Sequence, residues 1–383
     1  LGIGNGLRNY LVPALVQKDN LRIRKYISSA YVSIGFVVVV SSLVSLILFK
    51  FFNWNVIFNI SDSVISRQTL SLSVWIIFLG ILLQFILNLI NSILYAMQKS
   101  ALVSFLTLLS SIITLLYVLF AKTSDVSSNL ITLSIVRVIA VNLPLLITTI
   151  IIFSKRLKNC SPRIKYFEKE YAKDIIKLGG VFLWVQIMYM ILTATNEFLI
   201  TWFSGPAMVV EYLIYYKLFT LISMIFMLAL TPIWSAVTKA FSEKRYSWIR
   251  KLYKLLKYVA FVGMIFEFLI IIFLQNIINL WLGDSSIKVN YFYAFIFAVS
   301  GSILIWNGVF SSIANGLGKL RTQSILFTLG AIIKIPLAWI LVKYFDSWIG
   351  VMIANIISIG LYCIIQPIIL RKILNREEIK GEK

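Results

Sequence analysis

Ten apolar stretches, each long enough to cross a lipid bilayer, constrain this chain more than any other feature. A membrane core about 30 Å thick needs roughly 20 helical residues. None of the stretches has the period-two alternation of a membrane barrel strand. Only 13% of the 383 residues are charged, against about 25% in a soluble domain. The sequence therefore predicts an all-α integral membrane protein, a polytopic bundle with spans near residues 30–49, 72–97, 101–120, 130–153, 178–203, 209–236, 257–282, 290–315, 323–342 and 348–370.

Basic residues are distributed unevenly among the segments that join these spans. If the first segment is cytoplasmic, 28 of the 36 Lys and Arg residues fall in cytoplasmic segments and 5 in the opposite set. Cytoplasmic loops of membrane proteins carry an excess of Lys and Arg, so we expect both chain ends in the cytoplasm. The same distribution accounts for the net charge of +21 without a nucleic-acid partner. Anionic membrane lipid is the partner that we expect for the basic loops.

The chain divides into four expected parts. We expect an N-terminal lobe of four spans over 1–153 and a C-terminal lobe of six spans over 178–370, with a cytoplasmic tail over 371–383. A basic amphipathic linker over 154–177 joins the lobes on the cytoplasmic side. Apolar residues recur at steps of three and four within this linker, and again over 248–256, which predicts two helices lying in the membrane interface. A solvated basic linker is the alternative.

Two short matches relate the two halves of the chain. A shift of 226 residues places the neighbourhood of Lys18 on that of Lys244, and a shift of 220 places Lys99 on Lys319. Both matches fall in expected cytoplasmic turns, so the copies are parallel repeats about an axis normal to the membrane. The repeat predicts two lobes related by a pseudo-twofold axis. It also predicts two further spans before Leu1, which makes twelve in all.

Five ionisable residues lie well inside apolar stretches, namely Arg137, Glu197, Lys217, Glu267 and Lys334. A charge at the bilayer centre costs at least ~2.5–3.5 kcal/mol on insertion scales, so each should face a partner or a wet cavity. We predict that Arg137, Lys217 and Lys334 line a cationic cavity for a diphosphate headgroup. An ion pair between Glu197 and Lys217 is the alternative.

Two uncharged polar residues join the expected site, and the motifs that the chain lacks argue against an enzyme. Asn88 and Asn307 lie on the second span and on its repeat partner, as glue between helices or as sugar-binding donors. The chain has no His, no phosphate-binding GxxxxGK[ST] loop, and two cysteines without metal-binding spacing. We therefore predict no enzyme activity, no metal and no resident cofactor. A polysaccharide polymerase or ligase is the enzyme alternative, and it would need a larger outward-facing segment than this chain has.

Four segments carry a resemblance to a known family: GIGNGLRN at 2–9, TNE at 195–197, YKLF at 216–219 and TPIWSA at 231–236. This pattern resembles the bacterial flippases that carry O-antigen and capsule repeat units. They belong to the multidrug/oligosaccharidyl-lipid/polysaccharide exporter superfamily. The resemblance covers most of the chain.

The resemblance implies a monomeric transporter of the bacterial inner membrane, with two six-helix lobes that open alternately to either face. Its cargo would be an oligosaccharide on undecaprenyl diphosphate, delivered to a polymerase for lipopolysaccharide or capsule synthesis, with H⁺ or Na⁺ as the coupling ion. Asn5, Arg8 and Asn9 would then belong to a cytoplasmic gate, and Asn196 would join Glu197 at the cavity. A drug or small-cation antiporter of the same superfamily is the alternative, although it should prefer buried acids over bases.

Overall fold

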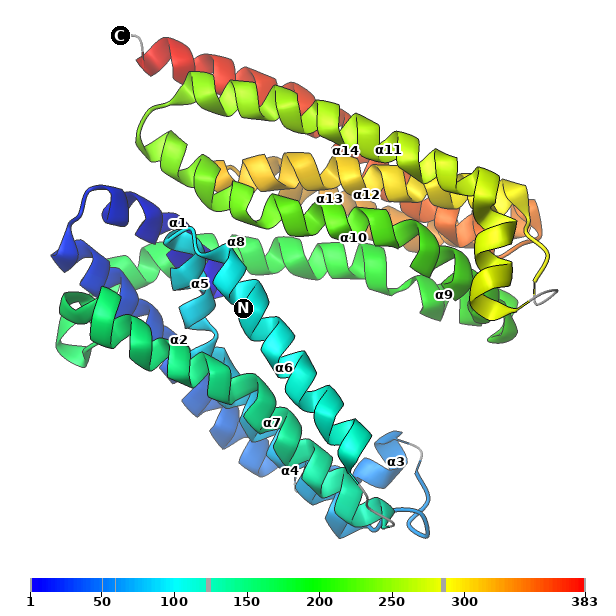
Figure 1. The fold of residues 1–383 in the computed structure, drawn as a ribbon, viewed down its shortest axis with the longest axis horizontal. Helices are drawn as coiled ribbons and strands as arrows, with labels where there is room; N and C mark the ends of the chain where they lie inside the picture. Colours follow the sequence, from blue (N-terminus) through cyan, green and yellow to red (C-terminus); the bar gives the residue numbers. More distant parts are fainter. Residues whose placement is uncertain (1, 50, 59, 122–124, 284–286, 382–383) are drawn as a thin grey trace. The chain divides into compact units, whose positions relative to one another are not determined.

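The structure, a computed structural model, is almost entirely helical. It describes residues 2–49, 51–58, 60–121, 125–283 and 287–381, with side chains as far as residue 376. Within these ranges there is no β-strand, and ten helices are long and apolar enough to cross a membrane, one for each predicted stretch (Figure 1). The predicted all-α polytopic bundle is thus confirmed. The helices form two compact units, Leu1–Gly180 and Val181–Lys383.

The first unit is organised around a short helix, α1, which packs against α2 and α5. Leu7, Leu11, Ile27 and Ile93 are fully buried between these three helices, while α4 packs along α7. Many of the remaining side chains on α2, α6 and α7 are large, apolar and exposed, as expected where lipid is the solvent. The helices are α1 (Gly2–Val16), α2 (Asn20–Leu48), α3 (Trp54–Phe58), α4 (Arg67–Leu87), α5 (Leu89–Ala96), α6 (Ser100–Phe120), α7 (Val126–Ile151) and the start of α8 (Lys169–Ala194).

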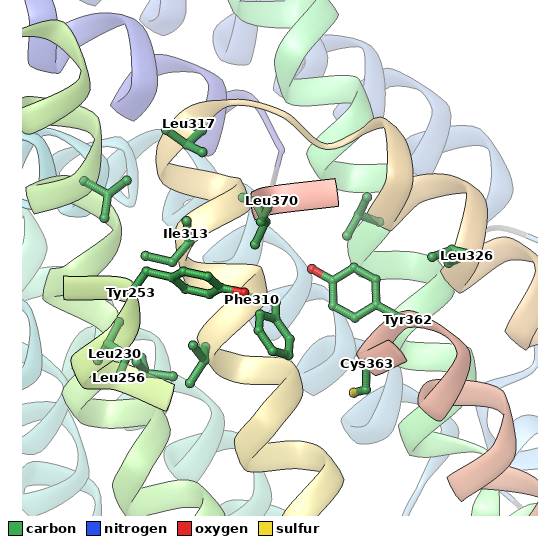
Figure 2. Close-up of a cluster of buried hydrophobic side chains, with 14 of the residues drawn as sticks. Leu230, Tyr253, Leu256, Phe310, Ile313, Leu317, Leu326, Tyr362, Cys363 and Leu370 are labelled. Atoms are coloured by element: carbon green, nitrogen blue, oxygen red, sulfur yellow. The ribbon is translucent and has the colours of Figure 1, made fainter. Parts of the chain in front are cut away.

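The second unit is centred on α12, which packs against α10, α11 and α14. Figure 2 shows Tyr253 on α11, Phe310 on α12 and Tyr362 on α14 within one apolar cluster. The Tyr253 and Phe310 ring centroids are 6.0 Å apart. The helices are the rest of α8, α9 (Asn196–Ser204), α10 (Ala207–Ser242), α11 (Tyr246–Leu282), α12 (Tyr291–Leu317), α13 (Arg321–Phe345) and α14 (Ile349–Gly381).

Neither of the two amphipathic stretches forms a separate helix, and their place in the membrane interface stays a prediction. The first contains a 3₁₀ turn at Ile164–Tyr166, after which α8 begins at Lys169 and continues into its span. The second is the beginning of α11. Likewise, α14 continues to Gly381 through the expected tail. The physical reason is that helical hydrogen bonds do not end where apolar residues end: α8 continues even through Gly179 and Gly180.

Two spans that the sequence predicts as continuous are interrupted instead. The helix expected over 72–97 breaks between α4 and α5 at Asn88, and the one over 178–203 breaks between α8 and α9 at Thr195. No Pro stands at either break. Polar side chains compete locally with the helical hydrogen bonds: the Thr195 hydroxyl donates to the carbonyl of Ile191 at 2.6 Å, and Asn91 donates to Asn88 Oδ1 at 2.6 Å.

Five tight turns share one backbone conformation. One, at Asp346 (φ 47°), joins α13 to α14, and the other four bear on the sequence repeat. In each, a residue with positive φ ends a helix, and the next N–H donates to the carbonyl five residues earlier. This is the Schellman helix end. The shift of 226 relates the first pair of turns and the shift of 220 relates the second, so the repeat in the sequence is a repeat in the backbone. The left-handed residues of these four turns are Lys18 (φ 55°) with Lys244 (56°), and Gln98 (59°) with Gly318 (66°).

Candidate functional site

A polar pocket of about 220 Å³ lies within the first unit, between α4, α5, α6 and α7. Arg137 comes from near the middle of α7, and its charge is therefore placed far from either end of that helix. The break at Asn88 brings two asparagines to the pocket wall. The other polar residues that line the pocket are Gln84, Asn91, Thr107, Ser110 and Ser111.

The Arg137 guanidinium has no ion-pair or hydrogen-bond partner among the described residues. The hydroxyls of Thr107 and Ser111 donate to carbonyls of their own helix, at 3.2 and 3.1 Å, so their oxygen lone pairs remain as acceptors. Asn91 Nδ2 donates to Asn88 Oδ1, which leaves the Asn88 amide protons as donors. The pocket thus presents one cation together with amide and hydroxyl groups, a combination suited to an anion with attached hydroxyls.

Lys334, on α13, is fully buried within the second unit. Its ammonium donates to the carbonyl of Leu192 at 2.6 Å and to Thr195 Oγ1 at 2.9 Å, and a third contact reaches the carbonyl of Ile191 at 3.4 Å. These acceptors stand at the break between α8 and α9, where the end of α8 leaves carbonyls without helical partners. Lys334 therefore satisfies the broken helix, and its charge is met by carbonyl dipoles instead of an acid.

Glu267, on α11, is also fully buried. The Ser223 hydroxyl lies 3.2 Å from Glu267 Oε1 and 3.1 Å from the carbonyl oxygen of Gly301, so its one proton serves one of them at a time. Glu267 Oε2 has no hydrogen-bond partner among the described residues. A Cβ at position 301 would lie 2.6 Å from the carboxyl carbon, so only glycine leaves room for the acid. The result is a closed group of oxygen atoms with one unsatisfied carboxylate oxygen.

Three further candidate residues near the α8–α9 break and on α10 differ in burial: Asn196 is buried, whereas Glu197 and Lys217 are exposed. Asn196 is buried and its Nδ2 donates to the Tyr212 hydroxyl at 3.4 Å, while the neighbouring Glu197 is exposed. Lys217 is exposed on α10, and its ammonium lies 6.0 Å from the centroid of the Trp281 ring. Within the described ranges, Glu197 and Lys217 do not form an ion pair; the two ion pairs there are elsewhere. The alternative of mutual neutralisation is therefore wrong.

Asn307 belongs to a polar network inside the second unit. The Ser311 hydroxyl lies 3.3 Å from Asn307 Oδ1 and 3.4 Å from the Tyr362 hydroxyl, and it accepts a hydrogen bond from Gln323 at 3.2 Å. These groups join α12, α13 and α14. Each partner in the network lies on a helix, which is the arrangement of polar glue between spans.

Residues of α1 pack closely within the first unit. The Arg8 guanidinium is buried and lies 4.6 Å from the centroid of the Tyr95 ring on α5. Asn9 is buried beside it, and Asn5 is half-buried. A Cβ on Gly179 would lie 2.8 Å from the carbonyl oxygen of Gly2, so α1 and α8 meet backbone to backbone. This close approach explains why glycines are frequent at the start of α1.

The structure brings Arg137 and Asn88 together in one pocket and places Lys334 and Glu267 in two separate buried settings. Reasoning from the sequence missed the partners of these residues. One signal was available: Thr107, Ser110 and Ser111 follow the i, i+3, i+4 spacing that places hydroxyls on one face of α6. The partners of Lys334 carried no such signal, because they lie about 140 residues away along the chain.

No protein-family model and no curated protein matches the sequence, whereas solved structures match its fold. A MATE transporter in complex with MaD3S has a TM-score of 0.78 at 14% identity, over 98% of this chain and 84% of that one. A multidrug resistance MATE transporter of the MOP superfamily, in an outward-facing conformation, scores 0.77 at 16%, with coverages of 98% and 84%. The Vibrio cholerae MATE transporter VcmN in the bent form scores 0.73 at 16%, with coverages of 99% and 85%. The chain is an integral membrane protein with the fold of the MATE transporters.

Proposed function

We propose that this protein is a secondary transporter that works by alternating access and moves a lipid-linked oligosaccharide diphosphate across a bacterial cell membrane. The observation that carries the proposal is the Arg137 pocket. Arg137 is exposed on the surface of its own unit but stands in the middle of a membrane helix, and a charge at that depth needs an anion or water nearby. The amides and hydroxyls beside it suit a saccharide.

The diphosphate supplies what the pocket lacks. Arginine binds phosphate oxygens through two parallel N–H groups, and such charge-assisted bonds are about twice as strong as neutral ones. Asn88 and Gln84 add amide donors, and the Ser111 oxygen accepts from sugar hydroxyls. A cargo of this class can leave the headgroup region only if protein groups replace its water. The fold likeness to transporters supports movement of the cargo rather than its chemical conversion.

The coupling ion, H⁺ or Na⁺, is assigned in this proposal to Glu267. Its free Oε2, the Ser223 hydroxyl and the Gly301 carbonyl supply only oxygen atoms, which are the ligands that hard cations prefer. Proton uptake at the carboxylate would satisfy the same unpaired oxygen. The proposal keeps both chain ends in the cytoplasm, with a polymerase receiving the cargo on the other side.

A drug or small-cation antiporter is the second candidate, and the buried Glu267 favours it, because an acid in an apolar setting attracts cationic cargo as well as a coupling ion. The fold neighbours include a transporter described as conferring multidrug resistance. Under this reading Arg137 contributes nothing to binding, whereas replacement of Glu267 abolishes transport.

Flipping in proteoliposomes separates the two candidates. The vesicles hold a fluorescent polyprenyl-diphosphate oligosaccharide, and an impermeant glycosidase outside reports how fast the saccharide reaches the outer leaflet. We expect Arg137→Gln to lower the initial flipping rate at least tenfold. Arg137→Lys, which keeps the positive charge, should lower that rate less. Arg67→Gln, which removes an exposed charge at the start of α4 in the same unit, serves as the matched control and keeps the rate within twofold.

The same vesicles test the second candidate through efflux of a cationic dye. Wild-type flipping with no dye efflux supports the oligosaccharide proposal. If Arg137→Gln and Arg67→Gln both flip at the wild-type rate, the pocket does not carry the cargo and the proposal fails. Dye efflux that depends on Glu267 alone, without flipping, selects the antiporter.

A further inference from the structure

A second pocket, of about 300 Å³, lies within the second unit where the beginning of α11 meets the end of α14. Figure 1 shows the C-terminal part of α14 running beside the start of α11, and the two helices are in contact. No residue of the pocket takes part in the transport site proposed above. It therefore calls for an explanation of its own.

Four basic side chains line this pocket from two helix faces. Arg250, Lys254 and Lys257 are spaced i, i+4 and i+7 on α11 and therefore share one face of that helix. Arg371 faces them from α14. The neighbouring bases Lys251 and Arg376 lie on the same two helices but do not line the pocket. The arrangement is thus a property of helix register and not of basic composition alone.

The pocket is amphipathic as well as basic. Tyr253 and Leu374 are buried and form an apolar part of its lining, and the Lys257 ammonium lies 4.8 Å from the Tyr253 ring centroid. Arg250 Nη2 donates to Asn375 Oδ1 at 2.9 Å, which links the two helices across the pocket. A polar rim above an apolar lining, at the end of two spans, matches the level at which a phospholipid headgroup joins its chains.

The charge balance of the pocket favours an anionic occupant. None of the described side chains that line it is acidic, and the charges of Lys254, Lys257 and Arg371 repel one another across one recess, a repulsion that an anion would offset. Basic pockets between membrane helices suit phosphate headgroups, since Arg and Lys replace the water around phosphate oxygens. In the orientation expected from the loop charges, the pocket opens at the inner leaflet.

We infer that this pocket binds the phosphate headgroup of an anionic phospholipid, with Arg250, Lys254, Lys257 and Arg371 as the phosphate ligands. The lipid lies across α11 and α14 and holds these helix ends together. The site is independent of the transported cargo. Phosphate chemistry could also be offered by a soluble diphosphate, and the test below separates the two sources.

Native mass spectrometry of the purified full chain in detergent measures the bound lipid directly. The probes are diphosphatidylglycerol, phosphatidylglycerol and phosphatidylcholine, with inorganic diphosphate as the soluble arm. We expect the wild-type protein to retain an anionic lipid and K254Q/R371Q to bind it at least tenfold more weakly. The matched control, K251Q/R376Q, also removes one Lys and one Arg from the same two helices, and it stays within twofold of wild type. Lys254 is exposed, and the single variant K254E is also expected to bind the anionic lipid more weakly than wild type.

Three results would overturn the inference. The first is equal binding of phosphatidylcholine and the anionic lipids. The second is equal loss in the two double variants, since overall charge rather than the pocket would then attract lipid. The third is binding of inorganic diphosphate that depends on Lys254 and Arg371 while lipid binding does not, which assigns the pocket to a soluble phosphate.

Discussion

Replacing Gly301 by Ala tests whether the Glu267 oxygen group is as tightly packed as the structure indicates. The added Cβ would lie 2.6 Å from the carboxyl carbon and from Oε1, and 2.7 Å from Oε2, all well inside van der Waals contact. Because Glu267 is fully buried between α10, α11 and α12, its carboxylate can move only by giving up its contact with Ser223.

The magnitude follows from three effects. Overpacking a core costs about 1–3 kcal/mol, and loss of a hydrogen bond to an acid adds about 1–3 kcal/mol. Alanine is about 1 kcal/mol more favourable than glycine inside a helix, which offsets part of this loss. We therefore expect Gly301→Ala to lower the free energy of unfolding by about 1–5 kcal/mol. Gly360→Ala is the matched control, because a Cβ there meets nothing within 4 Å and only the helix propensity changes.

The assay is reversible unfolding of the purified chain in mixed micelles, followed by far-UV circular dichroism for wild type and both variants. The double variant Gly301→Ala with Glu267→Ala removes the clashing carboxylate and should recover part of the loss. Equal stability of Gly301→Ala and Gly360→Ala would refute the reasoning. Equal instability of the double variant and Gly301→Ala would show that the clash involves something other than the acid.

Three further perturbations have defined outcomes. Lys334→Met should lower the free energy of unfolding by about 1–3 kcal/mol, because carbonyls at the α8–α9 break lose their donor. Lys343→Met, at an exposed position on the same helix, should change the free energy of unfolding little in the same assay. Lys18→Gly should raise the free energy of unfolding by about 1 kcal/mol, since glycine tolerates the left-handed φ of 55°. A variant no more stable than wild type would contradict the turn geometry. Burial raises the pKa of the Cys160 thiol, so maleimide should label it slowly at pH 8 and faster as pH rises; labelling at the rate of the denatured chain would refute this. The folded chain then holds this proton longer than the unfolded chain, so stability should fall as pH rises above the ordinary thiol value of about 8.5.

The fold could be predicted from the sequence because lipid imposes one rule on every span. An apolar run of about 20 residues has to be helical when no water is present to satisfy its backbone. All ten predicted spans are helices. The two breaks at Asn88 and Thr195 escaped prediction, because a polar residue inside a span is as compatible with a continuous helix as with a broken one.

The sequence predicted which ionisable residues lie in membrane spans, but not which partners they meet. Hydropathy alone indicated that Glu267 and Lys334 are buried in spans, and both are fully buried. It could not distinguish them from Lys217, which is exposed on α10, since a span that is apolar all round does not indicate which face meets protein. The pairing of Lys334 with the end of α8 depends on how helices far apart in the sequence pack, and periodicity carries no such information.

The four Schellman turns that belong to the sequence repeat have a consequence for how the chain enters the bilayer. Each joins two helices through only three residues, so α1 with α2, α5 with α6, α10 with α11, and α12 with α13 are helical hairpins with almost no slack. A hairpin places its tight turn on one side of the membrane and commits both arms to opposite directions at once. Topology is then set pairwise, and a charge that reorients one arm has to carry its partner across with it.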